Sequence, residues 1–166
     1  MVDCARASLA VAAALAAAAV ALTSGSDDPG RTAQAAGAVA FKELDHGTRP
    51  GSGGSEARRG RVLRTETGAK RVLRGWDLDR AVEAAAPVDF ARRSLLVVLD
   101  SSRPSTGYRL RVVRVDVRNR RAIVTATVRR AEGIDAQVIS RPYALLSIAR
   151  RSLAGATRGV VVRLQG

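Results

Sequence analysis

The sequence predicts a β-dominated α+β domain, in which antiparallel sheets of about seven strands accompany one broken helix. Three observations support this expectation. Apolar residues alternate with polar ones over several short stretches after residue 38, as on strands that bury one face. A single stretch, residues 67–86, changes to the period of a helix. Turn-forming residues separate these stretches at short intervals.

The predicted strands lie at residues 38–44, 62–65, 94–99, 107–118, 122–129, 142–149 and 159–164. The stretch 94–99 is continuously apolar and is therefore expected at the centre of a sheet, buried on both faces. Within 107–118 the apolar parity changes between Val112 and Val113, which indicates a bulge or burial of both faces. Residues 47–60 are glycine-rich and predict a loop, and residues 119–121 predict a hairpin turn.

The broken helix is predicted from four apolar residues at helical spacing, Ala69, Val72, Leu73 and Trp76. Thr67 is expected to cap its start, because a threonine hydroxyl can accept a bond from an unpaired N–H of the first turn. Asp77 is expected to cap a further helical turn, which ends before Pro87. Trp76 is interpreted as the side chain that seats the helix on the sheet.

The first part of the chain, residues 1–37, is predicted to be a signal peptide followed by a processing and linker segment. The apolar run 9–22 is shorter than the ~20 residues of a membrane-spanning helix and suits a signal peptide, although an uncleaved anchor helix is the alternative. The only cysteine, Cys4, precedes this run, which argues against a lipid anchor. We therefore expect residues 38–166 to form a secreted or extracytoplasmic envelope domain, with no transmembrane span in the mature chain.

Catalytic chemistry is not predicted. His46 is the only histidine, and no Gly-x-Ser-x-Gly motif or cluster of metal ligands is present in the sequence. The sequence therefore predicts no catalytic, cofactor-binding or metal-binding residues, and we expect a binding domain that is not an enzyme and needs no cofactor.

The charge predicts attraction to polyanions. The chain has 28 basic residues, nearly all of them arginine, against 15 acidic ones. An anionic envelope polymer is one expected partner, whereas DNA is disfavoured because the arginines are scattered and aromatic residues are few. The alternative is a solvated arginine-rich surface that binds nothing.

From Phe41 onward the order of motifs resembles the PrcB-type carboxy-terminal domain, named for a subunit of a bacterial surface protease complex. The matching segments are Phe41-Lys42-Glu43-Leu44, Val62-Leu63-Arg64-Thr65, the predicted helix, Pro87-Val88-Asp89-Phe90, Arg103-Pro104-Ser105-Thr106-Gly107-Tyr108 and Ser140-Arg141-Pro142-Tyr143. Thr106 stands where that family usually has a glycine. The resemblance implies a non-catalytic accessory domain that supports the assembly or stability of a secreted or envelope protease.

A second resemblance concerns chagasin-type inhibitors of cysteine proteases, which present three loops at one end of a β-sandwich. Residues 103–108 and 141–143 look like two of those loop motifs, and Gly51-Ser52-Gly53-Gly54 looks like the third, although their order along the chain differs. This resemblance implies a protease inhibitor as the alternative function.

The candidate contact residues follow from both resemblances. The first candidate is a partner-contact loop formed by Arg103, Pro104, Ser105, Thr106, Gly107 and Tyr108, and the second is the segment Arg141, Pro142 and Tyr143. The alternative for the loop is a tight connection between strands, in which Gly107 relieves strain and Tyr108 enters the core.

Overall fold

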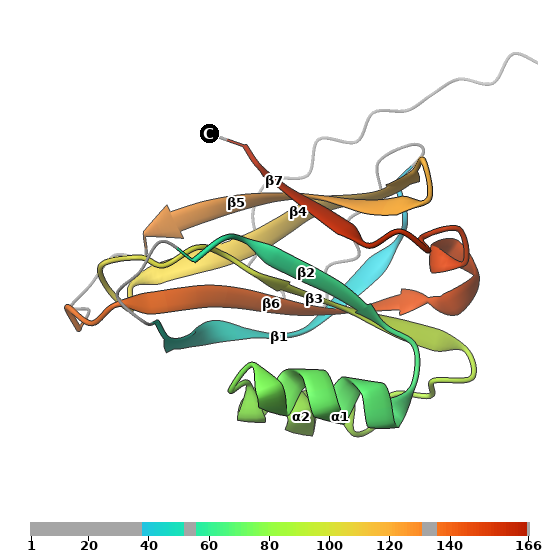
Figure 1. The fold of residues 1–166 in the computed structure, drawn as a ribbon, viewed down its shortest axis with the longest axis horizontal. Helices are drawn as coiled ribbons and strands as arrows, with labels where there is room; N and C mark the ends of the chain where they lie inside the picture. Colours follow the sequence, from blue (N-terminus) through green and yellow to red (C-terminus); the bar gives the residue numbers. More distant parts are fainter. Residues whose placement is uncertain (1–37, 52–55, 131–135, 166) are drawn as a thin grey trace, which may run out of the picture.

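The computed structural model describes residues 38–51, 56–130 and 136–165. Seven strands form two sheets, and two helices lie against one of the sheets (Figure 1). The predicted β-dominated α+β class is therefore confirmed. The predicted signal and linker segment, residues 1–37, lies outside the described residues. Within the described ranges, no helix has the length and apolar character needed to cross a membrane.

The larger sheet has four strands in the order β1-β6-β3-β2, and all of its neighbouring pairs are antiparallel. Its strands are β1 (Phe41–Pro50), β2 (Arg59–Leu63), β3 (Arg93–Leu99) and β6 (Ser140–Ala149). The smaller sheet has the order β4-β5-β7, with β4 (Tyr108–Arg118), β5 (Arg121–Arg130) and β7 (Val160–Leu164). β4 and β5 are antiparallel but β5 and β7 are parallel, so the expectation of antiparallel sheets fails at β7.

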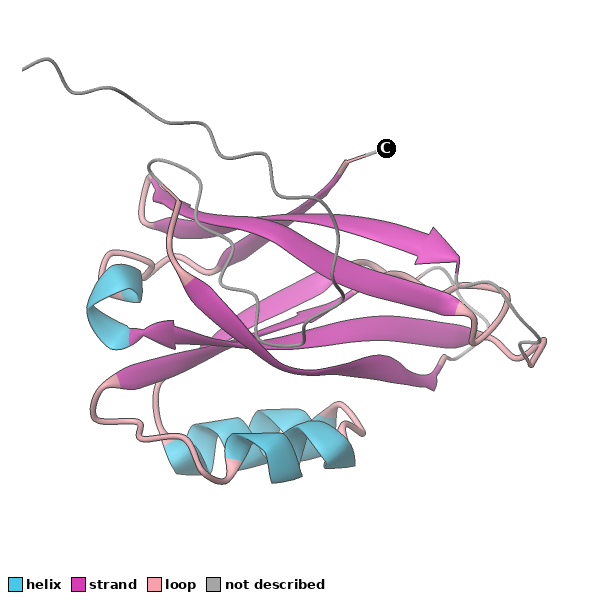
Figure 2. Ribbon diagram, turned by 180° about the vertical axis from the view of Figure 1, so that it is seen from behind, coloured by secondary structure: helices cyan, strands magenta, loops and turns pink. Residues whose placement is uncertain are grey.

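These elements stack in three layers, with the four-stranded sheet in the middle (Figure 2). The helices cover one of its faces and the three-stranded sheet covers the other, so two separate apolar cores form. Leu95 and Val97 belong to the core beneath the helices, whereas Leu96 and Val98 belong to the core between the sheets. This confirms that residues 94–99 form a central strand buried on both faces.

The broken helix consists of α1 (Glu66–Gly75) and α2 (Asp79–Ala85). Thr65, and not Thr67, caps α1: its hydroxyl accepts a hydrogen bond of 3.2 Å from the backbone N–H of Gly68. The expectation for Asp77 is also wrong, because Asp77 has a left-handed backbone (φ 53°) and α2 begins after Leu78 without a side-chain cap. Trp76 is half-buried and packs against the core beneath the helices, as interpreted from the sequence.

β1 is longer than predicted and continues to Pro50, so the predicted loop at 47–60 begins later. Gly47 lies opposite Tyr143 of β6, and a Cβ at Gly47 would lie 3.2 Å from Cε1 of the Tyr143 ring. The glycine at this position therefore makes room for a tyrosine ring on the neighbouring strand. Its presence does not end the strand.

The β4–β5 hairpin carries the predicted bulge, because its register shifts between Val112 and Arg114. The bulge keeps Val112 and Val115 in the core between the sheets and leaves Val113 on the surface. The turn is one residue shorter than predicted: Asn119 and Arg120, with φ of 50° and 62°, connect the strands. Positive φ at both residues is typical of the two-residue turns that match strand twist.

Candidate partner-binding site

The two predicted contact segments lie at the same end of the domain. The connection from β3 to β4 passes beside the start of β6, where the backbones of Arg103 and Ser140 exchange hydrogen bonds of 2.7 and 2.9 Å. Gly51, at the end of β1, donates a backbone bond of 2.9 Å to the carbonyl of Ile139. We call the described residues of the segments 47–51, 100–108 and 136–143 the loop end.

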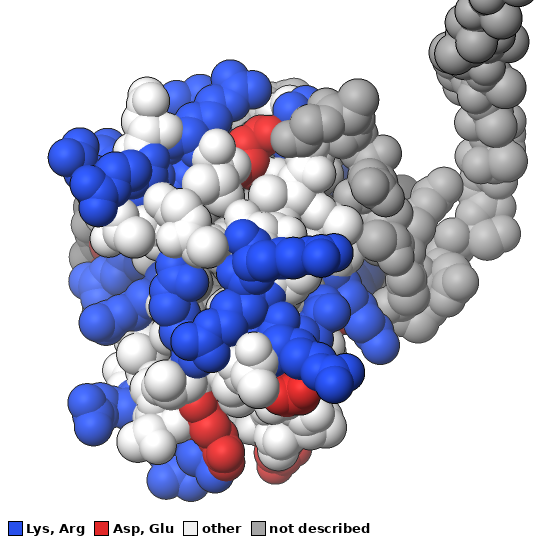
Figure 3. Space-filling model, turned by 90° about the vertical axis from the view of Figure 1, so that its right-hand side faces the viewer, with Lys and Arg blue, Asp and Glu red and all other residues white. Residues whose placement is uncertain are grey.

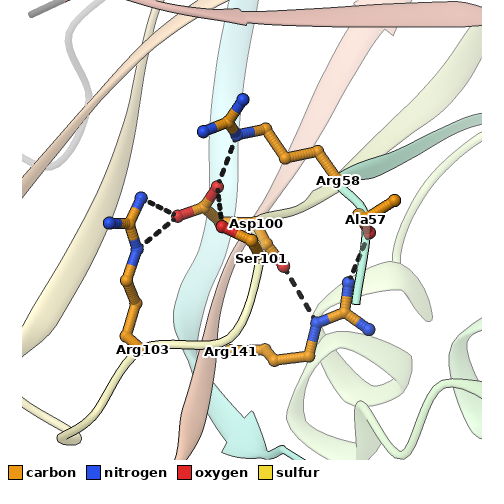
Figure 4. A network of polar contacts seen from close by, with 6 residues as sticks. All are labelled: Ala57, Arg58, Asp100, Ser101, Arg103 and Arg141. Carbon is orange, nitrogen blue, oxygen red and sulfur yellow. Dashed lines mark hydrogen bonds and ion pairs between the residues drawn. The ribbon is translucent and has the colours of Figure 1, made fainter. Parts of the chain in front are cut away.

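The base of the loop is fixed by the carboxylate of Asp100, which is completely buried (Figure 4). One carboxylate oxygen accepts a hydrogen bond of 2.9 Å from Nε of Arg58. The other accepts bonds of 2.9 and 2.6 Å from Nε and Nη2 of Arg103. Two cations and three charge-assisted hydrogen bonds therefore compensate the buried negative charge.

Arg141 holds the same loop from inside the domain. Its side chain is fully buried, and Nε donates 2.9 Å to the backbone carbonyl of Asp100 while Nη2 donates 2.9 Å to the carbonyl of Ala57 (Figure 4). Nη1 lies 2.6 Å from the carboxylate of Glu56. Burial lowers the pKa of the Arg141 guanidinium, and the charge of Glu56 opposes that effect.

Pro142 and Tyr143 are buried as well. The segment that the sequence suggested as a second contact site, Arg141 to Tyr143, thus lies within the fold. Arg141 and Pro142 can influence a partner only by shaping the loops above them, whereas Tyr143 also lines a pocket.

The tip of the loop is held to the segment before β6. The carbonyl of Ser105, a buried residue, accepts a hydrogen bond from the hydroxyl of Ser140. The backbone N–H of Thr106 donates 3.0 Å to the carbonyl of Ala136, and the hydroxyl of Thr106 accepts 3.1 Å from the N–H of Ala136. Thr106 therefore contributes a hydrogen bond that a glycine could not make. Pro104 and Thr106 are the exposed residues of this tip.

Tyr108 begins β4 and is only half-buried. The guanidinium carbon of Arg103 lies 5.6 Å from the centre of its ring, within the range of a cation–π contact. The sequence left Tyr108 as either a partner-contact residue or a core residue, and neither description fits completely. Tyr108 instead lines an open pocket of about 380 Å³. The pocket is lined by both predicted segments and by β1 and α2, through Gly47, Thr48, Arg80, Thr106, Gly107, Tyr108, Arg109 and Tyr143.

Tyr143 forms the floor of the pocket. Its hydroxyl donates a hydrogen bond of 2.6 Å to the carboxylate of Asp45, which also lies 3.4 Å from Arg80. Burial, together with the bond to Asp45, raises the pKa of the Tyr143 phenol far above its usual value. The phenol therefore keeps its proton at alkaline pH values at which an exposed tyrosine releases it.

The wall of the pocket carries positive charge. Arg109 contacts Nε2 of His46, whose Nδ1 lies 2.7 Å from the carboxylate of Glu43. The pocket thus presents cations, hydroxyls and ring faces, a set suited to holding a polar group of a partner. Among the described residues, no three His, Cys, Asp or Glu side chains are placed to hold a metal ion.

Two large apolar side chains of the loop end face solvent. Val138 is 54% exposed and Ile139 is 40% exposed, and Val113 is the only other such residue in the described ranges. The sequence interpretation missed this pair. The sequence feature that could have indicated this pair is an apolar dipeptide in a connection between two predicted strands.

Comparison of this chain with protein family models, with curated proteins and with solved structures gives no match.

Proposed function

We propose that this chain is an exported, non-catalytic accessory domain that binds a protein partner through its loop end. The observation that carries the proposal is the exposed pair Val138 and Ile139, in the segment whose two ends pair with Arg103 and Thr106 of the loop. Solvent-facing apolar residues next to one another are a common mark of protein–protein contact. Loops held on a rigid scaffold are also where binding residues concentrate.

The fixed geometry of the loop supports this proposal. A loop that must be ordered on binding loses affinity, because immobilising its side chains and backbone costs free energy. Here Arg103 is bound to Asp100, and Thr106 is bound to Ala136, before any partner arrives. The loop end is therefore ordered before binding, and it offers both an apolar pair and a polar pocket.

The resemblance to the PrcB-type domain supports a secreted or envelope protease as the partner. The domain would support the assembly or the stability of that protease. Thr106, which departs from that family's pattern, keeps the tip attached to Ala136 through its hydroxyl. The loop is therefore ordered even though position 106 is a threonine and not a glycine.

Protease inhibition is the second candidate, and one observation favours it. Gly51, the loop 101–108 and the segment 136–139 meet at one end of two packed sheets, as inhibitory loops must. Against it, the side chains of Arg141, Pro142 and Tyr143 are buried and so cannot enter a protease cleft. Inhibition predicts that the purified protein slows a papain-like protease in a dose-dependent way, and an unchanged rate at large excess would eliminate it.

The accessory function is tested by co-purification of the tagged full chain from the envelope and culture fractions of its host. Washing with high salt removes partners held by charge alone, and mass spectrometry identifies the retained proteins. We expect a protease to remain bound to the unaltered chain and to be lost from the double variant Val138→Ser/Ile139→Ser. Val113→Ser is the matched control, because it removes an exposed valine far along β4 from the loop end.

Two results would contradict the proposal. One is the absence of any protein retained in high salt. The other is equal loss of the retained protein from the loop-end variant and from the Val113→Ser control. A retained protein that is not a protease, but is lost only from the loop-end variant, would support the binding surface and contradict the assigned partner.

A further inference from the structure

The outward face of the three-stranded sheet is strongly basic. Leu110, Val112 and Val115 of β4 point into the core between the sheets, so the alternate residues of β4 and their partners on β5 and β7 point outward. The outward positions hold one acidic residue, Asp116, and seven arginines: Arg109, Arg111, Arg114, Arg118, Arg121, Arg129 and Arg163.

The register places arginines and threonines in rows across this face. Arg114, Thr125 and Arg163 are direct neighbours on β4, β5 and β7. Arg111 lies opposite Thr127 in the next row of β4 and β5. Each of these rows therefore offers guanidinium N–H groups beside a hydroxyl, which together suit the oxygens of a phosphate group.

Repulsion between two neighbouring arginines of this face indicates that it binds an anion. Arg118 and Arg121 are direct cross-strand partners, and like charges opposite one another destabilise a sheet. An anion that binds between them would remove the repulsion. Their position next to the β4–β5 turn extends the basic face around the end of the molecule, where Figure 3 shows many Lys and Arg side chains and few acidic ones.

Most of these arginines are not neutralised within the described part of the chain. Arg114 is held by Asp116 through two hydrogen bonds of 2.8 and 2.9 Å, and Arg109 turns toward His46. Asp116 also attracts the charge of Arg118. The remaining outward arginines make no ion pair with a described Asp or Glu: Arg111, Arg121, Arg129 and Arg163. The guanidinium N–H groups of these arginines can therefore donate hydrogen bonds to a ligand.

We propose that this outward face, the arginine face, binds a linear polymer whose repeating charges are phosphate groups. Outward residues repeat about every 6.8 Å along a strand, so an extended polyanion can meet successive rows. The planar arginine fork recognises phosphate oxygens in a bidentate way. The polymer is recognised by its charge, since none of the five aromatic residues that could stack on a base lies at an outward position of these strands.

A membrane surface is a weaker fit to the same face. Among the described residues, its outward apolar side chains are Val113, which is exposed, and the cross-strand neighbours Ile123 and Val161, which are half-buried. A protein that lies on a bilayer inserts a wider apolar face between the lipid headgroups, with aromatic residues among the anchors. The arginine face lacks both features, so the polymer is the occupant that we infer.

The test measures binding of the full chain to long-chain inorganic polyphosphate by fluorescence anisotropy over a series of salt concentrations. Two triple variants remove the same charge from opposite sides of the molecule. The test variant carries Arg111→Gln, Arg129→Gln and Arg163→Gln, and the matched control carries Arg61→Gln, Arg71→Gln and Arg74→Gln, at exposed positions of β2 and α1. Melting temperatures of both variants verify that they fold.

We expect the test variant to bind at least tenfold more weakly at low salt, and the control variant to bind within about threefold of the unaltered chain. The slope of log affinity against log salt should fall by about 2 in the test variant, at roughly 0.7 for each lost phosphate contact. Equal weakening in both variants, or no binding of polyphosphate at low salt, would overturn the proposal. If the test variant fails to fold, Arg→Lys at the same positions keeps the charge and should still lose the bidentate part of the affinity.

Further probes separate a phosphate polymer recognised by its charge alone from one recognised through its bases and from a lipid surface. Single-stranded oligonucleotides of equal charge should bind no more tightly than polyphosphate, and vesicles rich in anionic lipid should bind more weakly. Tighter binding of either probe would overturn the assignment. The arginine-face variant should still retain its protein partner in high salt, which keeps this test independent of the one for the loop end.

Discussion

The buried carboxylate of Asp100 accepts two hydrogen bonds from the guanidinium of Arg103, the residue three positions further along the chain. The same arginine pairs its backbone with Ser140 and places its guanidinium over the ring of Tyr108. Arg103 thus connects the end of β3, the start of β6 and the start of β4. Its side chain organises the loop from within, and the exposed residues around it are free to meet a partner.

Arg103→Ala should destabilise the domain by about 2–4 kcal/mol, because it leaves the buried carboxylate of Asp100 with Arg58 as its remaining cation. Urea unfolding at neutral pH measures this change. Arg71→Ala, at an exposed position of α1, removes the same side chain and should change stability by less than about 0.5 kcal/mol. Equal effects of the two substitutions would show that the network around Asp100 contributes nothing specific.

Arg141→Met should destabilise the domain by about 3 kcal/mol, since the buried carbonyl of Asp100, the carbonyl of Ala57 and the carboxylate of Glu56 each lose a partner. Adding Glu56→Gln should recover part of this loss, because the uncompensated charge is then absent. Thermal unfolding of the single and double variants tests the coupling. A well-folded Arg141→Met protein with unchanged stability would contradict the structural function of this arginine.

The stability of the domain should fall as the pH rises above about 10, the pKa of an exposed tyrosine. Folding raises the pKa of the Tyr143 phenol, chiefly by burial. The folded state therefore keeps a proton that the unfolded state releases, and the stabilising contribution of Tyr143 is complete below about pH 10 and is lost progressively above it.

Unfolding midpoints in urea at pH 8 and pH 11 measure this loss. In Tyr143→Phe the difference between the two midpoints should shrink, and stability at pH 8 should fall by about 1–2 kcal/mol for the lost bond to Asp45. An unaltered chain that ionises all its tyrosines near pH 10 without unfolding, followed by absorbance at 295 nm, would disprove the shift.

The parts of the fold that sequence predicted are those in which local pattern and tertiary environment agree. The run 94–99 is apolar at consecutive positions because β3 has a core on each face. The parity change after Val112 is the direct trace of the β4 bulge. The direction of β7 left no trace of this kind, because a short valine-rich strand can pair with a parallel or an antiparallel neighbour.

The candidate site was less predictable than the fold. The motif order brought residues 101–108 and 141–143 to attention, and the structure brings both to one pocket. No local pattern indicates that Arg141 is buried, because its partners Ala57 and Asp100 are 84 and 41 residues away along the chain. Charged residues are ordinarily exposed, so a fully buried arginine can be recognised only when its partners are in place.

The final prediction concerns the seam where β2 of one sheet meets β7 of the other. A Cβ added at Gly60 would lie 2.5 Å from Cγ1 of Val160 and 2.9 Å from its Cβ, so the two strands must separate in Gly60→Ala. We expect a loss of about 1–3 kcal/mol in stability, as for other overpacked sites. Gly75→Ala at the end of α1 is the control, because an added Cβ meets no atom within 4 Å there and improves helix propensity.

The clash at this seam also predicts a rescue. Val160→Ala removes the methyl group nearest to the new Cβ but keeps the Cβ of residue 160, so Gly60→Ala/Val160→Ala should be partly rescued and more stable than the sum of the two single changes predicts. Urea unfolding of the four members of this cycle measures the coupling. Strictly additive losses would mean that β2 and β7 are further apart in solution than the structure places them. A favourable coupling would establish that β2 and β7 are in contact at this seam, which closes one side of the sandwich.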